Sequence, residues 1–379
     1  MAYPNIDFLY LSEKDMLAAG VDDVLACTDC MEEVLKLLDL GDYRMGGESA
    51  NSHGCMVQFP DHPEFPEMPE DGPDRRFMAM PAYLGGKFDM AGVKWYGSNV
   101  GNREKGLPRS ILMITLNDKE TGAPKAYLSG NLVSAYRTAA VPGAGVKRLA
   151  REDAKVLGIV GAGVINSITV ETFAALRPSI NTLKISGRGQ ASIDRCIAYV
   201  KEKCPQIKTF VVCDSLEDCV RGSDILSFAT STPTGGQDTY PYVEPEWLKP
   251  GVLVCATGAL NTDEKLLMDP KTKLVVDNTK LYETWAEEYP YPTFEKWFIF
   301  GSKFTDMIHE GKLEKSRMED IGAILNGKVP AREREDQIIF YSIGGMPVED
   351  VAWGEEIYKR AKAQGIGTKL NLWESPYLY

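Results

Sequence analysis

Residues 156–166 read VLGIVGAGVIN, an apolar run followed by two glycines and the start of a helical pattern. An apolar strand that ends in Gly-x-Gly and opens a helix is the context in which this short motif indicates a dinucleotide-binding turn. Gly161 permits the tight turn, and Gly163 lets the backbone approach a pyrophosphate resting on the first N–H groups of the helix. Asn166 replaces the third glycine of the fingerprint, so we expect looser packing of helix on strand.

The segments after this turn continue the alternation of strand and helix. Apolar strands separated by helices indicate a parallel sheet covered on both faces. A glycine turn in some other α/β fold is the alternative, and the length of the series favours a doubly wound Rossmann domain over residues 151–344. The expected strands are Val156–Val160, Thr182–Ser186, Phe210–Cys213, Ile225–Ala229, Val252–Ala256 and Leu274–Asp277, and the expected helices are Asn166–Leu176, Ser192–Lys203 and one opened by Ser215.

The first 150 residues have a different character and predict an α+β unit. Helical patterns occupy Glu13–Leu40 in two pieces, and the Pro-rich, acidic stretch 60–75 predicts an exposed loop. Asn131–Leu149 predicts a helix that Pro142 should kink or interrupt. Short β-type runs lie between them, at Phe77–Met80, Met90–Tyr96, Ser110–Asn117 and Ala126–Ser129.

Composition excludes several classes of function. The chain has 379 residues and a net charge of −12, which predicts two domains and disfavours nucleic-acid or membrane-surface partners. Apolar runs reach only about ten residues, against roughly 20 for a bilayer-spanning helix. The start of the chain shows no basic and apolar leader, so we expect a cytoplasmic protein. Cys27 and Cys30 form the only CxxC, and without a second pair at zinc-site spacing we expect reduced structural thiols and no metal.

The end of the second expected strand bears on the choice of nicotinamide cofactor. NAD sites usually place Asp or Glu there for the ribose 2′-hydroxyl, but this segment reads SGRGQ from Ser186 to Gln190. Arg188 can pair with a 2′-phosphate, Gly187 leaves room, and Ser186 can add a hydroxyl donor. This favours NADP(H) over NAD(H). The alternative is that Arg188 is a solvated surface charge.

Several motifs together resemble the ornithine cyclodeaminase/mu-crystallin family. The resemblance starts from Arg137-Thr138-Ala139-Ala140 and the Gly-Ala-Gly turn that follows it, and it covers nearly the whole chain. Further matching stretches are Val93–Trp95, Leu116–Pro124, Gly251–Ala259 and Gly344–Asp350. The long N-terminal half and the ending of the chain look most like a long subgroup. That subgroup includes the N-(1-amino-1-carboxyethyl)glutamate dehydrogenase type and proteins known as tyramine oxidase subunits.

The resemblance implies a domain plan and an assembly. Residues 1–150, completed by 345–379, would form a substrate-binding and dimerisation domain, and residues 151–344 the dinucleotide-binding domain. A homodimer would be built on the N-terminal sheets. The implied partner is a small amino acid or imine substrate.

The resemblance also implies roles for individual residues. Lys94 would contact the substrate carboxylate near the reacting carbon, and Arg137 would clamp that carboxylate through its planar fork. Without the resemblance, a snorkelling lysine and a structural ion pair would be the simpler interpretations. Thr138 would touch a cofactor phosphate and Ser342 would lie near the nicotinamide amide. The full set of expected cofactor contacts is Thr138, Gly161, Ala162, Gly163, Val164, Ile165, Ser186, Gly187, Arg188, Thr230 and Ser342.

Two departures from the family pattern change the expected chemistry. Cyclodeaminases carry an aspartate after the fifth strand of this domain, where this chain has Leu260, a substrate-side position that cannot move a proton. Asp263 matches a more structural position. An arginine that many members place before the Met-Pro motif is missing near Ser52 or His53, and Arg76, with its neighbour, is the candidate replacement for binding substrate. His53 is either an acid–base group or a loop histidine without a role.

Three hypotheses follow. The leading one is an NADP(H)-dependent oxidoreductase, with NAD as alternative, that transfers hydride to or from the α-carbon of an amino acid, an N-substituted amino acid or its imine, with Lys94 relaying the proton. The second is an ornithine cyclodeaminase-type lyase with retained NAD, which Leu260 disfavours. The third is a non-catalytic cofactor-binding protein of mu-crystallin type.

Overall fold

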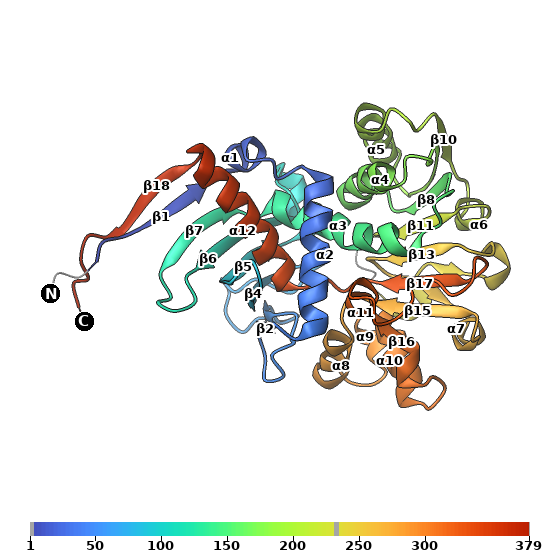
Figure 1. Cartoon of the computed structure of the whole chain (residues 1–379). Helices are drawn as coiled ribbons and strands as arrows, with labels where there is room; N and C mark the ends of the chain where they lie inside the picture. The colour runs from blue at the N-terminus through green and yellow to red at the C-terminus, as the bar shows by residue number, and fades with distance from the viewer. Residues whose placement is uncertain (1–3, 231–234, 379) are drawn as a thin grey trace. The chain divides into compact units, whose positions relative to one another are not determined.

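The computed structural model, which describes residues 4–230 and 235–378, divides into two compact units (Figure 1). The first comprises the chain up to Asp23, Gly41–Arg137 and the chain from Met346 onward, and the second Val24–Leu40 and Thr138–Gly345. Two helices therefore differ from the expected boundary at residue 150, because α2 (Val24–Leu40) and most of α3 (Asn131–Leu149) belong to the second unit. The physical reason for α2 is its packing against α4 (Val164–Leu176) and α11 (Ile321–Leu325).

The second unit is built on a parallel sheet of eight strands. Their order is β10-β9-β8-β11-β13-β17-β15-β16, and each neighbouring pair runs parallel. The order reverses at β8, so the crevice between β8 and β11 is the switch point at which doubly wound sheets bind ligands. The strands are β8 (Val156–Val160), β9 (Thr182–Ser186), β10 (Thr209–Val212), β11 (Ile225–Phe228), β13 (Leu253–Ala256), β15 (Thr272–Val276), β16 (Met318–Asp320) and β17 (Ile338–Ser342).

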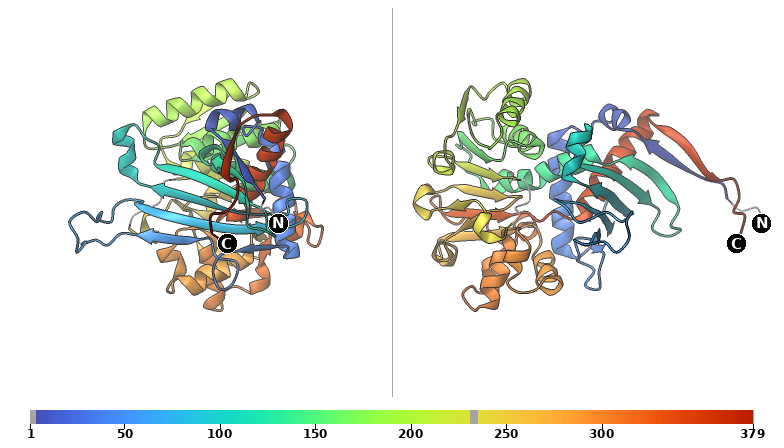
Figure 2. Two further views of the ribbon diagram at one scale, coloured as in Figure 1. Left: turned by 90° about the vertical axis from the view of Figure 1, so that its left-hand side faces the viewer. Right: turned by 180° about the vertical axis from the view of Figure 1, so that it is seen from behind.

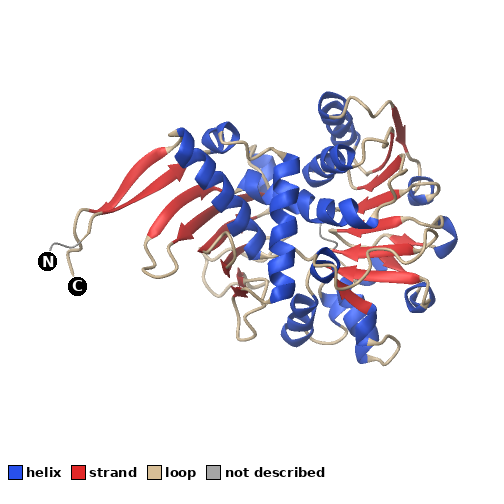
Figure 3. Cartoon of the chain, viewed as in Figure 1, coloured by secondary structure: helices blue, strands red, loops and turns tan. Residues whose placement is uncertain are grey.

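Helices alternate with these strands along the chain, as the sequence predicts for a Rossmann domain (Figure 3). The small pair β12 (Tyr242–Val243) and β14 (Asn261–Thr262) lies outside the main sheet. Short 3₁₀ turns occupy Gln237–Thr239, Pro245–Trp247 and Lys315–Arg317. The remaining helices of this unit are α5 (Gln190–Lys203), α6 (Leu216–Val220), α7 (Glu264–Met268), α8 (Thr279–Glu288), α9 (Thr293–Lys296) and α10 (Gly301–His309).

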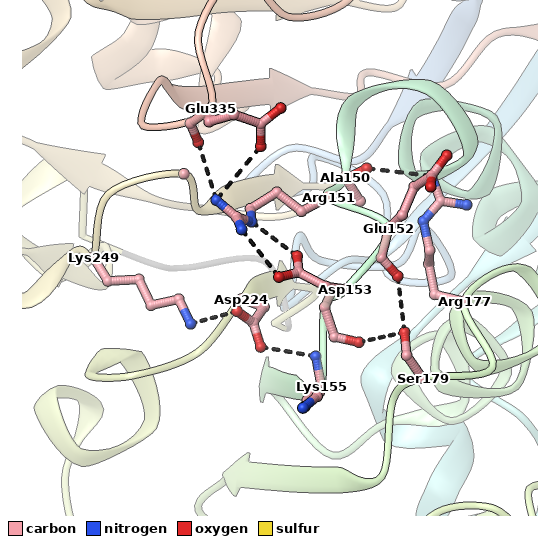
Figure 4. A network of polar contacts seen from close by, with 12 residues as sticks. Ala150, Arg151, Glu152, Asp153, Lys155, Arg177, Ser179, Asp224, Lys249 and Glu335 are labelled. Carbon is pink, nitrogen blue, oxygen red and sulfur yellow. Dashed lines mark hydrogen bonds and ion pairs between the residues drawn. The ribbon is translucent and has the colours of Figure 1, made fainter.

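A polar network fixes the amino ends of the central strands (Figure 4). Asp224, just before β11, accepts hydrogen bonds from the backbone N–H groups of Lys155 and Val156 at the start of β8, both at 2.8 Å. It also pairs with Lys249, which precedes β13. Arg151 pairs with Asp153 at 3.0 Å on the approach to β8. These contacts satisfy backbone groups at the edge of the sheet opposite the glycine turn, so they support the scaffold rather than the ligand end.

The first unit contains a largely antiparallel sheet with α12 (Pro347–Gln364) packed on β4, β5 and β6 (Figure 2). The strand order is β18-β1-β7-β6-β5-β4-β2, and β3 also pairs with β4. Only the β1–β7 pairing is parallel among the strands that the structure describes. The elements are β1 (Ile6–Leu11), α1 (Glu13–Ala18), β2 (Tyr43–Met45), β3 (Cys55–Gln58), β4 (Arg76–Leu84), β5 (Met90–Ser98), a 3₁₀ turn (Val100–Lys105), β6 (Ser110–Asn117), β7 (Pro124–Ser129) and β18 (Thr368–Trp373).

Three expectations from the sequence can be compared directly with these elements. The interruption predicted at Pro142 is wrong, because α3 runs unbroken through it; residues 139–146 are all buried, and this packing outweighs the hydrogen bond that proline removes. Cys27 and Cys30 are buried on α2, and no group able to hold a metal occurs among the described residues. Within those residues, no helix combines the length and the apolar character needed to cross a membrane. Residues 1–3, where the missing leader was sought, lie outside the described ranges.

Candidate active site

The glycine turn after β8 has the geometry that a dinucleotide requires. Gly161 adopts a φ of +97°, and a Cβ there would lie 2.5 Å from the carbonyl oxygen of Ala229, so only glycine fits. Its N–H donates to the carbonyl of Ser186 at 2.8 Å, which ties the turn to the end of β9. A Cβ at Gly163 would meet no described heavy atom within 4 Å. The space above Gly163 is therefore open to a ligand.

The first turn of α4 presents its backbone donors toward this open space. The helix begins at Val164 directly after Gly163, which provides no side-chain cap. The N–H groups of Val164 and Ile165 are thus left at the positive end of a helix of 13 residues, where a pyrophosphate is stabilised. Ala162, nearly buried, completes the turn. The predicted cofactor turn and helix start coincide in the structure.

Asn166 has a different effect from the one expected. Its side chain is fully buried, and its Nδ2 donates to the carbonyls of Val160 at 3.0 Å and Gly161 at 2.7 Å. Its Oδ1 accepts from the hydroxyl of Ser227 on β11 at 2.7 Å. The looser packing predicted from the missing glycine is therefore replaced by a polar tie from α4 to β8 and β11.

Two threonine hydroxyls at the ends of adjacent strands lack partners. Thr230 follows β11 and Thr257 follows β13, and neither buried Oγ1 atom has a hydrogen-bond partner in the described part of the chain. A buried unsatisfied hydroxyl costs roughly 1–3 kcal/mol, so such pairs at a switch point fit a polar ligand. Thr230 was predicted as a cofactor contact. Thr257 was missed, although its place after an apolar strand was the available signal.

The other predicted nucleotide-site residues have distinct environments. Arg188 is exposed in the loop between β9 and α5, with the exposed Gly187 and half-buried Ser186 before it. Arg188 makes no hydrogen bond or ion pair to any residue within 4–230 and 235–378. Ser342 is fully buried at the end of β17, where its Oγ accepts from the Gly301 N–H at 2.8 Å and the Tyr282 hydroxyl at 3.2 Å. Its hydroxyl therefore serves the interior of the second unit.

Two residues after β13 also have clear positions. Leu260 is fully buried within the second unit. Asp263 caps α7 by accepting from the N–H of Lys265 at 2.6 Å, the structural role that the resemblance implies. Thr138 follows Arg137 on α3 and is half-buried.

In the first unit, alternate residues of β4 and β5 carry the chemistry on one face of the sheet. Lys94 lies opposite Met80, and Tyr96 lies opposite Met78. Side chains two residues apart on a strand point to the same face, so Lys94 and Tyr96 share a face. This is the face that α12 covers, because Asp350 in the first turn of α12 contacts Lys94.

Lys94 and Arg137 meet in a buried cluster with two carboxylates. Lys94 Nζ lies 2.6 Å from one oxygen of Asp350, and Arg137 Nε lies 3.1 Å from the other. Arg137 Nη1 lies 2.6 Å from Glu349. Lys94 is 2% exposed and Arg137 6%, while both carboxylates are fully buried. The structure thus brings together the two residues that the resemblance paired, and adds the two carboxylates that hold them.

The cluster is electrostatically balanced but leaves donors for a ligand. The chain's own carboxylates engage Nε and Nη1 of Arg137, so Nη2 takes part in neither pair. Glu349 and Asp350 sit in the first turn of α12, where the helix dipole favours negative charge. Nη2 and the Lys94 ammonium can therefore accept a substrate carboxylate without displacing Glu349 or Asp350.

The environment sets the acid–base behaviour of Lys94. Burial lowers the pKa of its ammonium to about 8, with the charge of Arg137 acting in the same direction. Asp350 and Glu349 oppose this lowering. Burial alone would also lower the pKa of Arg137, but the same two carboxylates outweigh it and hold that pKa above its usual value. Lys94 can therefore gain or lose a proton near neutral pH while Arg137 stays charged.

Arg76, the predicted replacement for the missing arginine, begins β4 opposite Ser98. It forms an ion pair with Asp74, and its Nη2 lies 3.4 Å from the hydroxyl of Tyr96. The preceding Arg75 instead donates to the backbone carbonyl of Glu70 at 2.8 Å. Arg76 is thus on the same sheet face as Lys94, on the other side of Tyr96.

The model of the ornithine cyclodeaminase/mu-crystallin family matches residues 21–365. The chain belongs to this family. Among curated members it is 28% identical over 372 residues to N-((2S)-2-amino-2-carboxyethyl)-L-glutamate dehydrogenase of Staphylococcus aureus, covering 97% of this chain and 100% of that protein. It is 27% identical over 300 residues to Delta(1)-pyrroline-2-carboxylate reductase of Bacillus cereus, covering 77% and 84%.

Solved structures of this family show the same fold. An archaeal alanine dehydrogenase dimer with bound NAD superposes with a TM-score of 0.75 at 22% identity, covering 97% of this chain and 100% of that one. Delta(1)-pyrroline-2-carboxylate reductase of Thermococcus litoralis, in complex with NADH and L-proline, gives 0.75 at 24% identity, covering 95% and 99%. The predicted fold, a Rossmann sheet joined to an α+β domain, is confirmed by these family structures.

Proposed function

We propose that this family member is an NAD(P)-dependent oxidoreductase that acts at the α-carbon of an amino acid, an N-substituted amino acid or the corresponding imine. The observation that carries the proposal is the buried cluster of Lys94, Arg137, Glu349 and Asp350. It combines a fixed cation for a carboxylate with a lysine that titrates near neutral pH. The dehydrogenases and reductases among the relatives act, by name, on amino acids or a cyclic imine.

The residues of the cluster divide the work between them. A bound nicotinamide supplies or accepts the hydride at the substrate α-carbon. The substrate carboxylate binds Arg137 Nη2 with the Lys94 ammonium nearby. In reduction, Lys94 donates a proton to the imine nitrogen, so that the C=N bond becomes a C–H and an N–H bond. In oxidation, neutral Lys94 takes the proton from the amine. Asp350 orients the Lys94 Nζ through its 2.6 Å contact.

For the cofactor, we propose NADP(H). The open turn at Gly163, the uncapped start of α4 and the unpartnered hydroxyl of Thr230 fit a dinucleotide. Arg188 is exposed and unengaged by the described residues, which leaves it available to a 2′-phosphate. The alternative is NAD(H), the cofactor named in the two solved structures.

We also propose a cytoplasmic homodimer. The sheet face opposite Lys94 carries Phe77, Trp95 and Ile111, which are 41%, 37% and 46% exposed, and the rings of Phe77 and Trp95 stack at 5.7 Å. An exposed apolar face of this kind fits a second copy of the chain. The archaeal relative is described as a dimer. For the location, the support is that the eight cysteines form no disulfide in the described structure. Sedimentation of the wild type and of Trp95→Glu tests the dimer.

Turnover and binding measurements together test the activity. The purified protein is titrated with NADPH and with NADH, and NADPH oxidation is then followed on a panel of imines and of 2-oxo acids with ammonia. We expect turnover that falls 10²-fold or more in Lys94→Met and a greatly raised KM in Arg137→Met. Retained wild-type kinetics in both variants contradicts the proposal. Ammonia release from ornithine with tightly bound NAD indicates the lyase instead.

A further inference from the structure

A second charged cluster lies on the same sheet face as Lys94, within the first unit. Asp74, whose side chain is 5% exposed, pairs with Arg76 and with Arg109 Nη1, the latter at 2.9 Å. The hydroxyl of Ser98 donates to the same carboxylate at 2.6 Å. One carboxylate thus orients two guanidinium groups, and the cluster carries an excess positive charge.

Several donors of these arginines are unused. Arg76 Nε is buried and has no hydrogen-bond partner in the residues that the structure describes. Arg76 Nη2 makes only the long contact to Tyr96, and Arg109 uses only Nη1 in its ion pair. A buried, charged donor without a partner is costly, so the arrangement is incomplete as a purely structural ion pair. Burial and the neighbouring charge of Arg76 also lower the pKa of Arg109, a penalty that an anion would relieve.

The distance to the first cluster fits one small molecule. Lys94 Nζ lies 5.8 Å from the centroid of the Tyr96 ring, and Arg76 Cζ lies 5.9 Å from the same centroid. The two cations are therefore separated by no more than about 12 Å, the sum of those distances. Met78 and Met80 are buried beside Tyr96 and give the intervening surface an apolar character. Two cationic sites joined by an apolar strip suit a substrate with an anion at each end.

We propose that Arg76 and Arg109, oriented by Asp74, form a subsite for a second carboxylate of the substrate. The substrate is then an acidic amino acid or imine, whose distal carboxylate lies several bonds from the α-carboxylate. The planar forks of the two arginines bind a carboxylate with the directional hydrogen bonds that a lysine cannot provide. This inference rests on the proposed function in one respect, because the α-carboxylate is held at Arg137.

Binding of unreactive acids tests the subsite without any turnover. Glutarate and pentanoate differ only in the distal carboxylate, and calorimetry with the purified full-length protein measures both. We expect the wild type to bind glutarate at least tenfold more tightly than pentanoate. Arg76→Gln and Arg109→Gln should abolish this difference, because each removes part of the fork, while Arg137→Met weakens both ligands.

Arg75→Gln is the matched control, because it removes the same charge from the residue next to Arg76 without touching Asp74. It should keep the preference for glutarate. Arg109→Lys keeps the charge and should retain only part of the preference. Melting temperatures close to that of Arg75→Gln establish that the glutamine variants are folded. Equal binding of the two acids by the wild type, or an unchanged preference in both glutamine variants, overturns the subsite.

Kinetics separates the subsite from the proposed function. NADP⁺-dependent oxidation of L-glutamate and L-norvaline compares substrates with and without the distal carboxylate. Selective turnover of L-glutamate that Arg109→Gln removes supports both proposals. Equal turnover of both, unaffected by Arg109→Gln, refutes the subsite and leaves the oxidoreductase standing. A glutarate preference without turnover of any amino acid or imine supports the subsite and refutes the oxidoreductase.

Discussion

Replacing Asp350 by asparagine tests the assignment of Lys94 as the proton donor. The variant keeps the shape and one acceptor oxygen of the side chain but removes the charge that lies 2.6 Å from Lys94 Nζ. Burial lowers the pKa of Lys94 to about 8, and the charge of Asp350 is the largest influence opposing that lowering. Loss of an opposite charge at this range lowers the pKa of an ammonium by roughly 1–3 units. We expect the Lys94 pKa to fall to about 6.5 in Asp350→Asn.

The sign of the effect on rate follows from which form of Lys94 is needed. Imine reduction uses the ammonium form, so kcat/KM is high below the pKa and falls as the pH rises through it. At pH 7.5, a pKa of 8 leaves about three quarters of Lys94 protonated, whereas a pKa of 6.5 leaves about a tenth. Reduction at pH 7.5 should therefore drop roughly eightfold through protonation alone. Oxidation uses neutral Lys94, so its rising limb should also move to lower pH.

The assay is NADPH absorbance from pH 5.5 to 9.5 in both directions, on whichever substrate pair the wild type turns over. Glu355→Gln is the matched control, because Glu355 is also buried on α12 but pairs with Lys359. Its pH profile should resemble that of the wild type. If the Asp350→Asn limb stays near pH 8 or moves upward, while substrate binding is intact, the proton does not pass through Lys94 and the reasoning is refuted.

Four further substitutions probe the cofactor turn. Arg188→Ser should raise the NADPH dissociation constant at least tenfold and leave that of NADH unchanged in fluorescence titrations; equal effects would mean a solvated surface charge. Gly163→Ala should fold normally, since space surrounds it, but lose cofactor binding, whereas Gly161→Ala should lower the melting temperature because its Cβ meets a backbone carbonyl. Thr230→Val should raise the cofactor-free unfolding free energy by about 1 kcal/mol and weaken cofactor binding. Unchanged cofactor affinity in Thr230→Val excludes that contact.

The parallel sheet of the second unit was predictable because each strand is apolar throughout and each is followed by a helix. β8 and β9 begin and end at the predicted residues. β17 was not predicted, since it pairs between β13 and β15 although it follows both in sequence. Strand order of this kind depends on long-range packing, and a pattern along the chain does not encode it.

The candidate site was predictable in part. The resemblance identified Lys94 and Arg137 through local motifs, but Glu349 and Asp350 pair with them across 212 to 256 residues of sequence. Two acidic residues after Pro347 read equally well as an ordinary helix start. Arg109 had no signal at all, because a single arginine after a proline reads as a surface charge. Only the antiparallel register of β4, β5 and β6 brings Arg109, Arg76 and Ser98 to one end of the sheet.

The charge balance of the first cluster has a consequence for the order of events. With Lys94 and Arg137 charged, Glu349 and Asp350 bring the buried cluster to zero net charge, so the protein has no strong field of its own at Lys94. A substrate carboxylate then adds one negative charge next to the ammonium. An added negative charge raises the pKa of a buried lysine, so binding and protonation favour each other. The cluster therefore prepares its acid when a carboxylate arrives, and a substrate without that group would meet a lysine more inclined to stay neutral. Selection for carboxylates in this site thus operates on proton transfer as well as on binding.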